Sequence, residues 1–137
     1  MADDASRRAE VRWVGDLRFL GGEVGGPETF LDADGGAAPG PFIALMLAAG
    51  ACAGSDVVLI LGKSRVALTE LRVELVATRR DDHPRRLLAL ELVFHLRGEG
   101  LTQTNAARAV DLSITKYCSV LASLAPDISV THAIRLG

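Results

Sequence analysis

The sequence predicts an α+β domain in which curved, mostly antiparallel sheets cover two central apolar helices. The chain has 137 residues, of which 49% are apolar and 23% charged, as in a single folded domain. Two segments, 41–62 and about 104–124, have the length or spacing of apolar helices, and stretches around them alternate between apolar and polar residues. No linker or repeat divides the chain, so residues 1–137 are predicted to form one domain.

The first third of the chain predicts short strands joined by turns. Residues 10–14 alternate, and residues 17–20 are their expected hairpin partner. A third strand, 29–31, lies between glycine-rich stretches. Pro41 then opens the first helix, because proline loses no hydrogen bond in the first helical turn.

The first helix, 41–62, has almost no polar face before Ser55. It is long enough to cross a membrane, but Asp56 would be costly there, so a buried core helix is favoured, with Asp56 paired to Lys63 or an arginine. A helix that is apolar on all sides must be covered on all sides. A chain of 137 residues offers limited cover, so we predict an obligate homodimer.

The rest of the chain predicts two strands, a second helix and a last strand. Residues 71–78 and 88–97 each have one apolar face, and RRDDHPRR is the expected turn between antiparallel partners. A single helix is expected from about 104 to 124, with Tyr117 and Cys118 on or beside its apolar stripe. Residues 127–136 alternate as a strand, with His132 on its core side. The apolar strand faces are formed by Leu71, Val73, Leu75 and Ala77, and by Leu88, Leu90, Leu92, Phe94 and Leu96.

Charge and composition exclude several functions. The net charge is −2 and no basic cluster is interleaved with aromatic residues, so a nucleic-acid partner is not expected. No apolar core follows the charged start MADDASRRAE, which predicts a cytoplasmic protein without a signal peptide. The histidines and thiols lack the spacing of metal ligands, so no metal site is expected.

The chain has two cysteines, Cys52 and Cys118, and composition alone does not say why a thiol is present at either position. Cys52 lies about eleven residues into the first helix, beyond the reach of its N-terminal dipole. Burial raises the pKa of a thiol and makes it inert, so each cysteine can be read as a small buried hydrophobe. The other interpretation is that both thiols meet in one pocket, and spacing alone leaves the two open.

Two blocks carry a resemblance to a known family. PFIALMLAAGACAGSDVVLILGKSR resembles the first-cysteine helix of the OsmC/Ohr family, the osmotically inducible and organic hydroperoxide resistance proteins. ARAVDLSITKYCSV resembles the second-cysteine helix, and the strand pair between them and the ending ISVTHAIRL also fit. The resemblance covers nearly the whole chain and is closest to the OsmC-like branch. It implies an intertwined homodimer in which sheets from both chains wrap the central helices, with active sites at the subunit interface.

The resemblance also implies thiol peroxidase chemistry. Cys52 would attack an organic hydroperoxide and become a sulfenic acid, and Cys118 would resolve it into a disulfide. A dithiol such as a lipoyl group would then reduce the disulfide, and no cofactor or metal is required. In the peroxidase branches an N-terminal arginine holds the nucleophile as thiolate, and Arg18 is the best-placed match, with Arg12 behind it.

This chain departs from the family pattern at one place. Peroxidases of the family carry a glutamate shortly after the proline that precedes the first helix, but Phe42 and Ile43 follow Pro41 here. Without that glutamate, two alternatives stand beside the peroxidase. One is a protein that binds a hydrophobic ligand at the dimer interface without fast peroxidase activity. The other is a structural paralogue whose thiols are merely buried.

Overall fold

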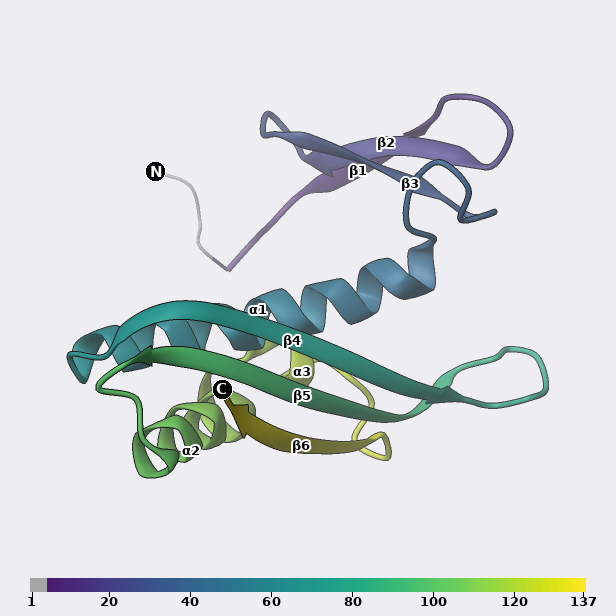
Figure 1. Cartoon of the computed structure of the whole chain (residues 1–137). Coiled ribbons are helices and arrows are strands. Elements are labelled where there is room, and N and C mark those ends of the chain that lie inside the picture. Colours follow the sequence, from purple (N-terminus) through teal and green to yellow (C-terminus); the bar gives the residue numbers. More distant parts are fainter. Residues whose placement is uncertain (1–4) are drawn as a thin grey trace. The chain divides into compact units, whose positions relative to one another are not determined.

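The computed structural model describes residues 5–137 and divides them into two compact units, residues 5–45 and 46–137 (Figure 1). Part of the charged start, residues 1–4, lies outside the described residues. The organisation as one domain stays a prediction. Each unit contains its own three-stranded sheet.

The first unit is a small antiparallel sheet with the order β1-β2-β3. Its strands are β1 (Ala9–Trp13), β2 (Arg18–Glu23) and β3 (Glu28–Asp32), close to the predicted positions. The carboxylate of Asp32, which is buried, ends the third strand. It accepts hydrogen bonds from the backbone N–H groups of Ala37 (2.9 Å) and Asp34 (3.0 Å), which lower the pKa of this carboxyl.

The helix α1 (Pro41–Lys63) begins at the predicted proline. Within the described chain only one face of α1 is buried, and small residues dominate that face. A Cβ on Gly50 would lie 2.7 Å from the Cδ1 of Leu75, so a larger residue here would require the Leu75 side chain to move where this helix meets β4. Apolar side chains on the rest of the helix stay exposed, among them Leu47 (51%) and Leu59 (64%). Length and composition alone would let this helix span a membrane.

The second unit contains a mixed sheet with the order β4-β5-β6 (Figure 1). The long strands β4 (Ala67–Arg79) and β5 (Leu87–Glu99) are antiparallel, whereas β6 (Ser129–Leu136) runs parallel to β5. The predicted apolar faces are confirmed except at Leu88. An irregularity in register opposite Arg79 leaves Leu88 exposed (38%) and buries Leu87 instead.

The prediction of one continuous second helix is wrong. The segment consists of α2 (Gln103–Leu112), the π-helix η1 (Ser113–Tyr117) and the short α3 (Ser119–Ala122). A capping box between Thr102 and Asn105 starts α2. The π-helix shifts the helical phase, which leaves Tyr117 51% exposed, and the backbone at Cys118 is extended (φ −71°, ψ 101°).

One apolar core holds the second unit together. Fully buried side chains from α1, β5 and α2 meet there, including Val57, Leu61, Phe94 and Val110. These side chains cover one face of the mixed sheet, and the opposite face carries the charged residues of β4 and β5. His132, predicted to face the core, is exposed on β6, so that prediction is wrong.

Candidate active site

The two cysteines lie together in the second unit. Cys52 is half-buried in the middle of α1, and Cys118 is buried, with 3% of its surface exposed, at the break between η1 and α3. Both are free thiols, and their side chains lie close enough for each to shift the pKa of the other. The interpretation in which both thiols meet is therefore the correct one of the two that spacing left open.

The break at Cys118 directs hydrogen-bond donors at the Cys52 sulfur. Because α3 begins anew after the extended residue, its first backbone N–H groups have no partner within the helix. Those of Ser119 and Val120 donate toward Cys52, and the Ser119 Oγ lies 3.8 Å from the Cys52 Sγ. Cys52 is too far into α1 to use the N-terminus of its own helix, and the second segment supplies the donors that α1 lacks.

These contacts separate the two thiols in acidity. Burial works to raise the pKa of Cys52, but the N–H of Val120, the Cys118 thiol and Ser119 outweigh it, so the pKa is lowered. Burial raises the pKa of Cys118 to about 11, and its hydrogen bond to Cys52 adds to that increase. The first proton is therefore lost from Cys52, while Cys118 keeps its proton and donates it toward the Cys52 thiolate.

Cys118 also has a structural part to play. Its Sγ accepts a hydrogen bond from the backbone N–H of Leu121 at 3.5 Å, so Cys118 is the N-cap of α3. The thiol that faces Cys52 thus also fixes the start of the helix that supplies N–H groups to it. A substitution of Cys118 therefore changes both the group that faces Cys52 and the N-cap of α3.

A buried hydroxyl ties the π-helix to α1. Ser113 is fully buried, and its Oγ lies 2.8 Å from the Asp56 Oδ2 and 3.2 Å from the Ala53 carbonyl oxygen. Asp56 was expected to pair with Lys63 or an arginine, but within residues 5–137 the hydrogen bond found for it comes from Ser113. Asp56 lies one turn after Cys52, so this bond fixes η1 close to the Cys52 thiol.

The other predicted site residues belong to the first unit or to the start of α1. Arg18 begins β2, pairs with Asp16 at 3.1 Å, and contributes to the lowered pKa of Asp32. A cavity of about 190 Å³ within the first unit is lined by Arg18, Phe30, Leu31, Asp32, Ala37 and Ala38. Phe42 and Ile43 lie in the first turn of α1, and Ile43 is 46% exposed.

An apolar groove of about 480 Å³ runs between α1 and β4 in the second unit. Its floor is formed by the small residues Gly50, Ala51 and Gly54, next to Cys52 in the sequence. The groove is lined by Leu47, Gly50, Ala51, Gly54, Ser55, Leu71, Val73 and Leu75. Among residues 5–137 no three histidine, cysteine or acidic side chains gather as a metal site would require.

Sequence reasoning missed the contributions of Ser113 and Ser119. No glycine or proline marks the break, so apolar spacing alone favours an unbroken helix. The available signal was the run of Ser, Thr, Cys and Ser at positions 113, 115, 118 and 119, whose short polar side chains compete for backbone groups. Thr115 shows this directly, since its Oγ1 donates to the Asp111 carbonyl oxygen at 2.7 Å.

Comparisons with known proteins agree with this architecture. Residues 33–133 match the family described as OsmC-like protein. Protein YhfA of Escherichia coli (strain K12) is 39% identical over 130 residues, which cover 94% of this chain and 97% of that protein.

Two solved structures resemble the chain over most of its length. A hypothetical protein from Aquifex aeolicus VF5 has a TM-score of 0.86 at 26% identity, with 96% of each chain covered. An organic hydroperoxide resistance protein OsmC from Legionella pneumophila has a TM-score of 0.67 at 15% identity, with 98% of this chain and 99% of the other covered, which shows a common fold.

Proposed function

The chain belongs to the OsmC-like protein family, and we propose that it is a cysteine-based thiol peroxidase that reduces organic hydroperoxides. The observation that carries the proposal is the contact between two thiols of opposite pKa shift, with the more acidic one, Cys52, also the more exposed. A peroxidatic cysteine reacts as the thiolate while its partner stays protonated, and the opposite pKa shifts of this pair favour that distribution of protons.

The proposed reaction balances with the residues present and one external dithiol. The Cys52 thiolate attacks a peroxide oxygen, the O–O bond breaks, and the alkoxide takes a proton and leaves as an alcohol. Cys52 becomes a sulfenic acid, which is a two-electron oxidation. Cys118 then attacks that sulfur, an S–S bond forms, and the sulfenic oxygen leaves as water with the Cys118 proton. A dithiol of the lipoyl type returns two electrons and two protons.

Arg18 is proposed to orient the peroxide and favour the Cys52 thiolate, as the family pattern implies. Its guanidinium is held by an exposed ion pair with Asp16, a contact worth little energetically and easily exchanged for a substrate oxygen. The Arg18→Gln variant should lose hydroperoxide turnover, whereas Arg7→Gln, which removes another exposed, ion-paired arginine of the first unit, should not. Equal turnover in both variants would remove Arg18 from the mechanism.

We further propose that the active protein is a cytoplasmic homodimer. Apolar side chains on α1 such as Leu47, Val58 and Leu59 are 48–64% exposed in the chain alone, and a second copy would cover them. Light scattering at micromolar concentration should give twice the mass of the chain. A stable monomer under those conditions would contradict this part of the proposal.

Mass mapping after oxidation tests the chemistry. Reduced protein is incubated with one equivalent of tert-butyl hydroperoxide, and a peptide pair joined by a Cys52–Cys118 disulfide is expected. The Cys52→Ser variant should lose turnover by about a thousandfold or more, because a serine hydroxyl is a poor nucleophile without a general base. If no disulfide forms and turnover is the same in Cys52→Ser, the protein is not a thiol peroxidase of this type.

A second candidate function is the binding of a hydrophobic ligand without fast peroxidase activity. The apolar groove between α1 and β4 favours it, together with Phe42 and Ile43, which make the start of α1 apolar where the family has a glutamate. A fluorescent long-chain fatty acid is a suitable probe. Saturable binding that is lost in Gly54→Leu, together with absent turnover, would favour this candidate over the peroxidase.

A further inference from the structure

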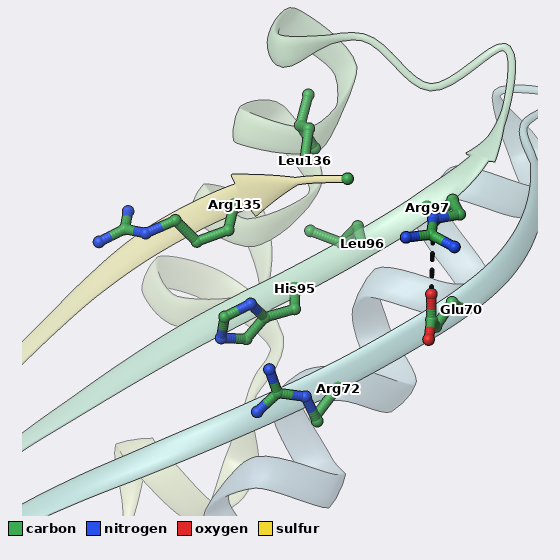
Figure 2. Close-up of a pocket in the computed structure, with 8 residues that line it drawn as sticks. Glu70, Arg72, His95, Leu96, Arg97, Arg135 and Leu136 are labelled. Carbon is green, nitrogen blue, oxygen red and sulfur yellow. Dashed lines mark ion pairs between the residues drawn. The ribbon is translucent and has the colours of Figure 1, made fainter.

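A row of basic residues crosses the outer face of the mixed sheet, away from the thiols. In the strand register Arg72 of β4 lies opposite His95 of β5, and His95 lies opposite Arg135 of β6. Side chains directly opposite each other on neighbouring strands have Cβ atoms only about 4.5–5.5 Å apart. Figure 2 shows His95 on the strand between the two arginines, with the Arg72 guanidinium turned toward the imidazole.

Within the described part of the chain, acidic residues of this face pair with Arg97 and His95 and leave the two arginines of the row without a carboxylate. Glu70 pairs with Arg97 at 3.6 Å, and Glu74 contacts the His95 Nε2 at 3.3 Å. Within residues 5–137, neither Arg72 nor Arg135 forms an ion pair with a carboxylate within 4.0 Å, and the Arg135 Nη1 donates a long hydrogen bond of 3.4 Å to the Ile134 carbonyl oxygen. The two arginines therefore leave positive charge on this face that a bound anion would neutralise.

The row borders a cavity large enough for a small molecule. The cavity measures about 320 Å³, at the lower end of the range for ligand sites. Three of its side chains are arginines and one is a histidine, whereas Glu70 is the single acidic side chain. The cavity is lined by Glu70, Arg72, His95, Leu96, Arg97, Arg135, Leu136 and Gly137 (Figure 2).

We propose that Arg72, His95 and Arg135 form a binding site for the phosphate group of a small molecule. A phosphate dianion presents three oxygens to the outer face of the sheet, enough for both guanidinium groups and the imidazole between them. Arginine binds such oxygens through two parallel N–H groups, a geometry that lysine cannot provide. The cavity has more space than a bare phosphate fills, which favours a phosphate ester of a small organic molecule. The free phosphate anion offers the same oxygens to the two arginines, so the experiment below separates the two ligands.

Calorimetric titration of the reduced, full-length protein at low ionic strength tests the site. The probes are inorganic phosphate and glycerol phosphate, because they separate the free anion from an ester. Arg72→Gln and Arg135→Gln should each weaken phosphate binding by about tenfold or more. Arg108→Gln, which removes an exposed arginine of α2 outside this row, should change it by less than about twofold.

The outcomes are distinct. Tighter binding of glycerol phosphate assigns the site to an ester, and equal binding of both probes assigns it to the free anion. Absence of saturable binding, or equal binding in all three variants, would overturn the proposal. Urea unfolding serves as the folding control: because Arg72 and Arg135 are exposed, Arg72→Gln and Arg135→Gln are expected to be about as stable as the original protein.

Discussion

The two cysteine-bearing segments are built differently. The helix α1 runs unbroken for 23 residues, and Cys52 is one residue within it. The segment that carries Cys118 passes through a π-helix and then breaks at the cysteine itself. The regular helix places a thiol without donors, and the broken segment brings the donors to it. The acidity of Cys52 is therefore controlled by the segment that carries the other cysteine.

Among the changes that test this difference between the two segments, removal of the Cys118 thiol is expected to have the largest effect, on steady-state turnover. In Cys118→Ser the sulfenic acid of Cys52 should form at a rate within about threefold of the original but then persist, because no thiol resolves it. Steady-state turnover should therefore collapse. Serine is a favoured N-cap, so α3 should keep its start. Stopped-flow measurement of the first turnover, with dimedone trapping of the sulfenic acid, checks this.

If Cys118→Ser instead turns over at the original rate, another thiol or the reductant resolves the sulfenic acid directly. The Cys52→Ser variant is the matched control, because it should form no dimedone adduct at position 52. The two variants together separate nucleophile from resolving thiol.

The next largest effect is expected in the pH dependence of alkylation, because the pKa values of Cys52 and Cys118 are shifted in opposite directions. Only the thiolate reacts with iodoacetamide. The pKa of Cys52 is lowered, so its labelling should rise at a pH below that of an ordinary cysteine and level off as pH increases. The pKa of Cys118 is raised to about 11, so its labelling should remain low until strongly alkaline pH. Peptide mapping at each pH distinguishes the two, and coincident profiles would contradict the comparison.

Much of the fold, but less of the site, could be predicted from the sequence. Alternation placed the strands, and Pro41 placed the start of α1, because these signals are local. The break at Cys118 left no such signal: no glycine or proline lies within α2, η1 or α3, and the π-helix depends on contacts such as that of Ser113 with Asp56. Leu88 was misplaced for a similar reason, since one irregularity in register reverses the side of the strand on which a residue lies.

A smaller effect is expected when the hydrogen bond between Ser113 and Asp56 is removed, because this change acts only on the π-helix η1. Ser113→Ala removes a fully buried hydroxyl and leaves the Asp56 carboxylate without its donor. The free energy of unfolding should fall by about 1 kcal/mol, the usual net contribution of one hydrogen bond, because the Asp56 carboxylate is only half-buried. Urea unfolding measures this. Thr115→Ala, which removes an exposed hydroxyl bonded to Asp111 in the same π-helix, should cost less. Equal losses in both variants would show that Ser113 does not anchor η1.

The smallest expected effect comes from the Ser119 hydroxyl, which approaches the Cys52 sulfur. Ser119 contributes one of several hydrogen bonds that lower the pKa of Cys52, and its Oγ lies 3.8 Å from the Cys52 Sγ. In Ser119→Ala the backbone N–H groups and the Cys118 thiol remain, so the pKa of Cys52 should rise only slightly. Alkylation of Cys52 at neutral pH should slow by about two- to threefold, in proportion to the lost thiolate. The control is Ser55→Ala, because the Ser55 hydroxyl donates to the Ala51 carbonyl oxygen at 2.7 Å. An unchanged rate in Ser119→Ala would assign the acidity of Cys52 to the backbone of the broken segment and to Cys118 alone.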